Sequence, residues 1–307
     1  MNAISSWKQP GWLMALGMSI ILSLSASAQT AAPARVTGIG APGGPEGTIA
    51  DPPAPSLAYS AETRSSPRPL RIHVLRLDLR DPGYALDVVL GRDPDGAGPA
   101  EAELTPPPRL LDTPDIVAAI NANAFAYAGP PRPKERAAWS PGDPVAITGW
   151  AKSLQREASR PAVREIASSF WVGADGRARI SPLAPQDTAR LAIAGFSPLV
   201  TDGRVTATSA QPLHPRTAIG VDATGFRVVM AVVDGRQPDY SEGMSLLELA
   251  ELMHSLGCHQ ALNLDGGGSS ILYYRGDDGW LAIKNRPSGI LPRPIPVMLV
   301  VRCLQGP

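Results

Sequence analysis

The segment from Asn263 to Ser270, NLDGGGSS, holds the residues of this chain that are best suited to chemistry. Three consecutive glycines cost about 1 kcal/mol each to order relative to alanine, so they are expected where backbone approaches a ligand closely or takes a positive φ. Their amides can bind an anion, and Asp265 beside them can act as an acid, a base, a nucleophile or a cation ligand. The alternative is a tight turn without function. Because a turn rarely needs three glycines between Asp and Ser, a functional loop is favoured.

The sequence before this loop predicts the elements that position it. Ser245 and Glu248 have the spacing of a capping box and Gly257 provides a stop, so a helix is expected between them. Apolar residues at helical spacing give that helix one face for packing on a sheet. Ala261–Leu264 is expected to be a short buried strand that leads directly into the loop.

Short apolar runs between Gly-containing turns predict further strands. Arg71–Arg80 and Tyr84–Leu90 are expected to pair as a hairpin, and residues 129–165 to form a long loop. Other strands or hairpins are expected at Ile116–Phe125, Phe170–Ile180, Leu191–Val205, Ala218–Val221, Phe226–Val233, Ile271–Tyr274 and Ile295–Val301. We therefore predict an α+β fold, a single sheet-dominated domain with a few packed helices, over residues 70–304.

The N-terminus predicts export. Lys8 precedes an apolar run from Gly11 to Leu24, and Ala26-Ser27-Ala28 supplies the small residues of a cleavage site. This pattern predicts a signal peptide over residues 1–28 and a secreted or periplasmic mature protein. An uncleaved membrane anchor is the alternative, but the run is short for a span of about 20 residues. No other stretch is apolar enough, so no membrane span is expected after cleavage.

Composition restricts the remaining alternatives. Residues 29–69 are rich in Pro, Ala and Gly and are expected to be a flexible linker. With 28 basic and 28 acidic side chains, the formal net charge is zero, so no nucleic-acid partner is expected. The two cysteines, Cys258 and Cys303, form either one disulfide or two free thiols.

Several blocks besides NLDGGGSS resemble the phosphodiester glycosidase family, whose members include a lysosomal enzyme that removes N-acetylglucosamine from mannose 6-phosphate diesters. The resemblance covers roughly Ile72 to Val301 and its blocks follow the family's order. These blocks are Ile120–Phe125, Ser197–Val200, Pro215–Gly220, Val233–Arg236, Ser241-x-Gly243, Glu248–Ala250 and Asn285-x-Pro287-Ser288.

The resemblance implies cleavage between the anomeric carbon of a sugar and a phosphodiester oxygen. Asp265 and Asp234 are the candidate catalytic carboxylates, without a division of roles, and Arg216 is the candidate for phosphate because a guanidinium can donate two parallel hydrogen bonds. The remaining candidates for substrate binding are Asn121, Asn123, Asn263, Asn285, Gly266, Gly267, Gly268 and Ser269. No cofactor is expected to be required, although a divalent cation such as calcium at Asp265 stays open.

Each assignment has a structural alternative. Asp234 could belong to a plain turn, and Arg216 could pair with a structural carboxylate. Arg236 is expected to be structural. A serine hydrolase is disfavoured because the G-x-S-x-G motif is absent and His214 has no motif context. None of the four histidines has metal-binding spacing.

We therefore expect an exported hydrolase that releases a sugar from a glycosyl phosphodiester of envelope or extracellular polysaccharide. Two alternatives share the same loop: a non-catalytic module that binds anionic glycans, and a transferase of sugars or phosphosugars in polysaccharide assembly. Turnover separates the first alternative from an enzyme, and product analysis with an alcohol acceptor separates the second from a hydrolase.

Overall fold

The computed structural model describes residues 55–96, 98–131, 138–160, 168–182 and 188–305. The chain divides into the units Met1–Pro52 and Pro53–Pro307, and the second unit carries all the described structure. The predicted signal peptide lies outside the described residues. Within them, no helix has both the length and the apolar character needed to cross a membrane.

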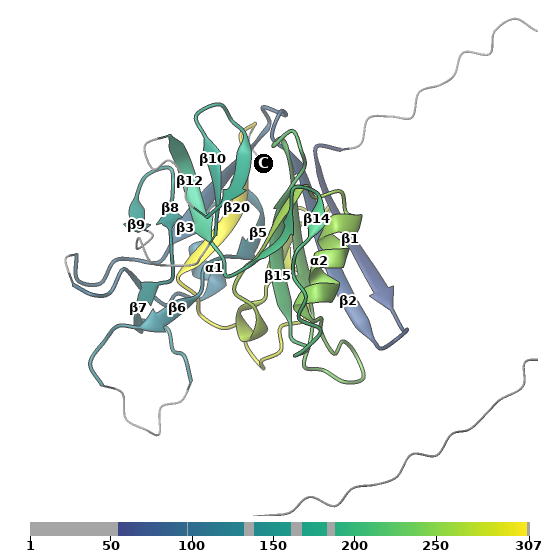
Figure 1. The fold of residues 1–307 in the computed structure, drawn as a ribbon. Helices are drawn as coiled ribbons and strands as arrows, with labels where there is room; N and C mark the ends of the chain where they lie inside the picture. Colours follow the sequence, from purple (N-terminus) through teal and green to yellow (C-terminus); the bar gives the residue numbers. More distant parts are fainter. Residues whose placement is uncertain (1–54, 97, 132–137, 161–167, 183–187, 306–307) are drawn as a thin grey trace, which may run out of the picture. The chain divides into compact units, whose positions relative to one another are not determined.

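A seven-stranded antiparallel sheet forms one layer of the second unit (Figure 1). Its strands in spatial order are β1 (Leu57–Arg64), β2 (Leu70–Asp78), β16 (Arg227–Val233), β15 (Arg216–Val221), β17 (Gln260–Asn263), β13 (Pro198–Thr201) and β14 (Arg204–Val205). Buried side chains of β16 alternate between two apolar clusters, with Val228, Met230 and Val232 on one face and Val229, Ala231 and Val233 on the other. Both faces of this sheet are therefore covered.

Two five-stranded sheets and a small three-stranded one complete the β structure. The first five-stranded sheet contains β19 (Leu281–Ile283), β18 (Leu272–Arg275), β5 (Ile116–Asn121), β20 (Val297–Cys303) and β3 (Tyr84–Leu90). The second contains β11 (Ala178–Ser181), β10 (Ser169–Gly173), β12 (Ala189–Ala194), β8 (Ala151–Lys152) and β9 (Glu157–Ser159). The small sheet contains β4 (Ala102–Glu103), β7 (Pro144–Ile147) and β6 (Phe125–Tyr127).

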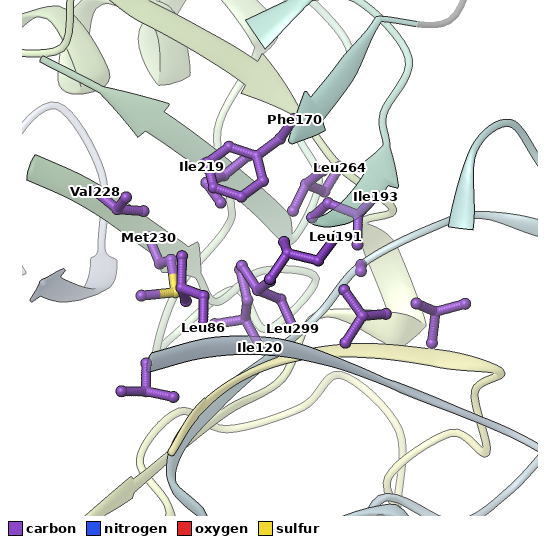
Figure 2. Close-up of a cluster of buried hydrophobic side chains, with 14 of the residues drawn as sticks. Leu86, Ile120, Phe170, Leu191, Ile193, Ile219, Val228, Met230, Leu264 and Leu299 are labelled. Atoms are coloured by element: carbon purple, nitrogen blue, oxygen red, sulfur yellow. The ribbon is translucent and has the colours of Figure 1, made fainter. Parts of the chain in front are cut away.

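The main apolar core joins the seven-stranded sheet to both five-stranded sheets. Figure 2 shows side chains from several strands converging there, among them Ile219 from β15, Ile120 from β5 and Phe170 from β10. Leu264 belongs to the same cluster and is fully buried. The residue immediately before Asp265 is thus fixed in the core, which anchors the start of the Gly-rich loop.

Helix α2 (Leu246–Ser255) packs on the opposite face of the seven-stranded sheet. Ser245 and Glu248 make the predicted capping box, and Gly257 follows with a φ of 86°. Leu249 and Met253 carry the buried face. The predicted helix is therefore confirmed. The other α-helix of the described residues is the single turn α1 (Pro107–Leu110), so the fold is mostly β and the α+β prediction holds only in its sheet-dominated part.

One predicted strand pairing and one predicted boundary differ from the structure. The predicted hairpin of Arg71–Arg80 with Tyr84–Leu90 is wrong, because β2 pairs with β1 and β16 whereas β3 pairs with β20 in another sheet. Leu57–Arg64, which we expected to lie in the flexible linker, forms β1 along the whole of β2. The edge of β2 that a β3 hairpin would use is therefore occupied by the chain that precedes it.

Residues 138–160, expected to belong to a long loop, contain β7, β8 and β9. Cys258 and Cys303 are thiols in the structure. Cys258 lies in the cluster under α2, and Cys303 packs against the main core on the other side of the seven-stranded sheet, so this sheet separates them. Burial raises the pKa of the Cys258 thiol to about 12.

Candidate active site

Backbone hydrogen bonds to two other segments hold the Gly-rich loop. After β17 the chain turns through Asp265 into the short 3₁₀ turn η1 (Gly267–Ser269), and Gly267 takes a φ of 61°. The Asp265 amide donates to the Ala122 carbonyl over 3.1 Å, and the Gly267 amide donates to the Pro215 carbonyl over 2.9 Å. Segments far apart in the sequence therefore set the position of the loop.

Asn121, at the end of β5, is the polar centre of this arrangement. Its side-chain amide donates to the Asp265 carbonyl over 2.6 Å. Its side-chain oxygen accepts hydrogen bonds from the Thr217 hydroxyl at 2.8 Å and from the Ile271 amide at 3.1 Å. The residue is 1% exposed. Asn121 thus positions the loop from behind instead of presenting its amide to a ligand.

A basic pocket of about 390 Å³ opens on the outer side of the loop. It is formed by the loop, by residues that follow β12, and by segments around β15 and α2. Its lining residues are Phe196, Ser197, His214, Arg216, Arg236, Leu246, Asn263, Leu264, Gly266, Gly267, Gly268 and Arg293. Among the described residues, three arginines and no carboxylate line this pocket, Asp265 lying beside it, so the pocket is suited to an anion.

Two of these arginines lie against the glycines. A Cβ atom added to Gly268 would come within 2.4 Å of a terminal nitrogen of Arg293, and one added to Gly267 would come within 3.1 Å of Arg236. The missing side chains therefore make room for two guanidinium groups. Arg236 also has a φ of 61°, a conformation that costs a residue with a side chain about 1 kcal/mol or more and that is concentrated at functional sites.

Asp265 lies beside Arg293, and the pKa of its carboxyl differs from the ordinary value. Burial raises the pKa of its carboxyl above the ordinary 3.8, while hydrogen bonds from Ser269 and the Gly266 amide, and the charge of Arg293, act in the opposite direction. The Ser269 hydroxyl is also 3.4 Å from Arg293. The carboxyl, the hydroxyl and the guanidinium therefore form one connected group at the loop.

Arg216 and His214 also line the pocket. Arg216 is buried and donates to the Met244 carbonyl at 2.8 Å and to the Pro212 carbonyl at 2.9 Å, so two of its donors are used to join loops. His214 lies 3.5 Å from Arg236. Burial and then the charges of Arg236 and Arg216 lower the pKa of His214, which keeps its imidazole neutral at pH 7.

A family model for phosphodiester glycosidases matches residues 114–302, which include the loop, the pocket and most of the strands behind them. The chain belongs to the phosphodiester glycosidase family. No curated protein matches the sequence.

Solved structures share the fold of this phosphodiester glycosidase domain. The catalytic domain of zebrafish N-acetylglucosamine-1-phosphodiester alpha-N-acetylglucosaminidase, auto-inhibited by its pro-peptide, is 20% identical, with a TM-score of 0.57 over 81% of this chain and 84% of that chain. A Synechocystis protein is 14% identical, with a TM-score of 0.53 over 80% of this chain and 62% of that one. A Burkholderia pseudomallei protein described as exported is 16% identical, with a TM-score of 0.52 over 76% and 74%. At these identities the likeness shows the fold.

Asp234, one of the two candidate catalytic carboxylates of this phosphodiester glycosidase domain, lies outside the pocket. Its side chain has no exposed surface. It accepts hydrogen bonds from the Asn285 amide at 2.9 Å and the Arg286 backbone amide at 3.0 Å, and lies 3.3 Å from His73. Asp234 is therefore a buried acceptor that holds three segments together, and its predicted catalytic role gains no support from this arrangement.

The four asparagines predicted to bind substrate divide into two groups. Asn121 and Asn285 are occupied within the protein, and Asn285 links Asp234 to the loop by donating to the Ser270 carbonyl at 3.2 Å. Asn123 donates to the carbonyls of Thr148 and Trp150, both at 3.0 Å, and does not line the pocket. Asn263 does line the pocket, and its buried side-chain oxygen has no partner among the described residues. Of the four asparagines, Asn263 is therefore the one that lies at the pocket.

Three pocket residues went unrecognised in the sequence. Arg293 lies in a Pro-rich segment outside the resemblance blocks, so no local signal marks it. His214 has no motif context in the sequence. Arg236 is the last residue of the VDGR block and is expected from the sequence to be structural. In the structure, Arg236 is marked by its positive φ, and both Arg236 and Arg293 are marked by the glycines that they face.

The residues around Asp265 do not suit a cation. Among the described residues, no three His, Cys, Asp or Glu side chains gather at one point. The charged groups nearest to the loop are the guanidinium groups of Arg236 and Arg293, which repel a metal ion. The calcium site considered from the sequence therefore gains no support from the donor set.

Proposed function

We propose that this protein hydrolyses the bond between the anomeric carbon of a sugar and the oxygen of a phosphodiester. The observation that carries the proposal is the juxtaposition of the Asp265 carboxyl with Arg293 and Arg236 around the Gly-rich loop. The basic pocket offers guanidinium groups to a diester anion, and the Asp265 carboxyl lies beside this pocket, next to Arg293. Membership of the phosphodiester glycosidase family supports the same reaction class.

Arg236 and Arg293 bind the phosphate in this scheme, in place of the predicted Arg216. Two guanidinium groups beside adjacent glycines match the non-bridging oxygens of a phosphodiester, because each can donate paired hydrogen bonds. Arg216 keeps the pocket wall together through the carbonyls of Met244 and Pro212 and adds positive potential. Asn263 lines the same pocket and lies next to the sugar in this scheme.

One carboxylate is enough for the reaction. Ordinary glycosides need a second carboxyl to protonate a poor leaving group. A phosphate monoester leaves as a stabilised anion, and the two guanidinium groups neutralise the charge that develops on it. Asp265 then supplies the carboxylate that assists attack at the anomeric carbon. The burial of Asp234 is compatible with this scheme because no acid is needed on the leaving-group side.

Export of the mature protein and a sugar phosphodiester of envelope or extracellular material as its substrate are part of the proposal. The charged start, apolar run and small residues up to Ala28 support export.

Sugar release from a panel of synthetic glycosyl phosphodiesters tests the reaction. Purified protein is expected to yield free sugar and a phosphate monoester in equal amounts. With methanol added as an acceptor, a hydrolase yields free sugar as the main product. Binding of the panel without any product would contradict the proposal and support a glycan-binding module, and methyl glycoside as the dominant product would support a transferase.

A further inference from the structure

A second hollow, of about 770 Å³, opens beside the basic pocket and shares Arg236, Gly268 and Arg293 with it. Its walls come from the segment around α1, from Trp139 and from the loop that precedes β20. We refer to this hollow as the apolar groove. Because the two cavities meet at the two guanidinium groups, a phosphate held there has one substituent in each cavity.

The walls of the apolar groove offer little to a polar ligand. Six of its lining residues are prolines, which have no backbone N–H to donate: Pro106, Pro107, Pro108, Pro141, Pro292 and Pro294. Trp139 and Leu291 add apolar surface, and the Trp139 ring is held edge-on by Phe125 with 4.9 Å between ring centroids. Leu291 is 78% exposed, so it is available to cover a ligand.

Charge in the apolar groove is confined to one end. Among the described residues that line it, Arg236 and Arg293, at the boundary with the basic pocket, are the charged ones. A cavity that is cationic at one end and apolar along its length is complementary to an amphiphilic anion. A carbohydrate chain or a peptide in the same place would lose hydrogen bonds with water that these walls do not replace.

We infer that the phosphodiester substrate joins its sugar to an apolar alcohol, and that the hydrocarbon chain of this alcohol lies in the apolar groove. This inference rests on the proposed function. In that arrangement the sugar lies in the basic pocket at Asn263, with Asp265 beside the pocket. The phosphate contacts Arg236 and Arg293, and the chain follows the prolines and Trp139. The substrate class is then a glycosyl phosphate ester of a long-chain alcohol.

Binding of simple alkyl phosphates tests the groove independently of turnover. Each methylene group that is fully buried adds a factor of about four to affinity, so octyl phosphate is expected to bind about tenfold or more tightly than ethyl phosphate even with partial burial. Isothermal titration calorimetry of the purified protein gives both constants, with octyl phosphate kept below its micelle-forming concentration.

Two matched variants locate the effect. Leu291→Asp places a carboxylate in the groove and is expected to reduce the preference for octyl phosphate to about threefold or less. Leu304→Asp changes another exposed leucine, outside the groove, and is expected to keep the full preference. Equal binding of the two phosphates by the unmodified protein, or a preference that survives Leu291→Asp, would overturn the inference. So would tighter binding of an oligosaccharide phosphate of matched length.

Turnover separates this inference from the proposed function. A glycosyl octyl phosphodiester is expected to be cleaved with a kcat/KM about tenfold or more above that of the glycosyl ethyl compound. Equal rates for the two compounds would support the proposed reaction and show that the apolar groove does not bind the substrate. If neither compound is cleaved but octyl phosphate still binds more tightly than ethyl phosphate, the proposed reaction is contradicted. The groove is then a binding site for amphiphilic anions. Failure to bind either alkyl phosphate would overturn both.

Discussion

The side-chain amide of Asn121 donates to the backbone carbonyl of Asp265 over 2.6 Å, and so connects residues that are 144 positions apart in the chain. The same side chain accepts from Thr217 on β15 and from Ile271 just before β18. One buried asparagine therefore joins two sheets at the residue before the glycines. The position of the Asp265 carboxyl depends on this junction.

Replacement of Asn121 by alanine is expected to lower the free energy of unfolding by about 2–4 kcal/mol, because it leaves the Ile271 amide and the Asp265 carbonyl buried without their partner. Urea denaturation followed by circular dichroism measures the change. Gln260→Ala removes an exposed side-chain hydrogen bond to Asp202 and is expected to change stability by about 0.5 kcal/mol or less. Equal losses in the two variants would contradict the role assigned to Asn121.

Gly268→Ala is expected to reduce kcat/KM by about tenfold or more with little loss of stability. The new methyl group meets the end of the flexible Arg293 side chain, which can move aside but then leaves the phosphate position. Gly276→Ala is the matched control, because its methyl group also meets only side-chain ends, those of Asp278 and Lys284, away from the pocket. An equal fall in kcat/KM in both variants would contradict the role of Arg293 in binding the phosphate.

The raised pKa of Asp265 predicts the acid side of the pH profile. If the ionised carboxyl is the active form, kcat/KM falls as the pH drops through a value above 3.8, the ordinary pKa of an aspartate. A pH–rate profile from pH 3 to 8 checks this. A profile that stays flat down to pH 4 would show that the reactive group has no raised pKa.

The same shift has a consequence for stability. A carboxyl whose pKa is raised by folding stabilises the folded state while it is protonated, and this contribution is lost as the pH rises through the raised pKa. Asp265→Asn removes the buried charge, so its melting temperature is expected to exceed that of the unmodified protein at pH 7. The difference is expected to vanish below pH 3.8, where the carboxyl is protonated in both states. A lower melting temperature at pH 7 would contradict the cause given for the shift.

Much of the local structure could be predicted from the sequence. The capping box fixes the start of α2, and the antiparallel pair of β15 and β16 follows from two apolar runs around a turn. The Gly-rich loop stands out because its three glycines have a large entropic cost. Each of these signals is contained within about 20 residues of sequence.

Long-range partners explain what could not be predicted. β2 and β3 are adjacent in the sequence and lie in different sheets, because β1 occupies the free edge of β2. Asp234 looked catalytic beside Gly235, but its surroundings come from His73, Asn285 and Arg286. Arg293 lies against Gly268, although β18 and β19 separate the two residues in the sequence. None of these contacts leaves a pattern in the neighbouring residues.

Asp234→Asn tests the reassignment of that residue. The remaining oxygen can still accept from Asn285 and Arg286, but an NH₂ group replaces the oxygen that faces His73 and the Arg286 amide, so the free energy of unfolding is expected to fall by about 1–3 kcal/mol. At a temperature where the variant is fully folded, its kcat is expected to stay within about tenfold of the unmodified value, because the Asp234 side chain has no exposed surface. A loss of kcat as large as that of an active-site variant would return Asp234 to the catalytic pair.

The most direct measurement is the rate of sugar release from a glycosyl phosphodiester by the unmodified protein, by Asp265→Asn and by Asp277→Asn, an exposed aspartate in the turn between β18 and β19. We expect Asp265→Asn to lose about a thousandfold or more in kcat while keeping its fold and its affinity for ethyl phosphate, and Asp277→Asn to match the unmodified protein. A near-normal rate in a folded Asp265→Asn protein would contradict the central claim that the carboxyl of the Gly-rich loop carries the reaction.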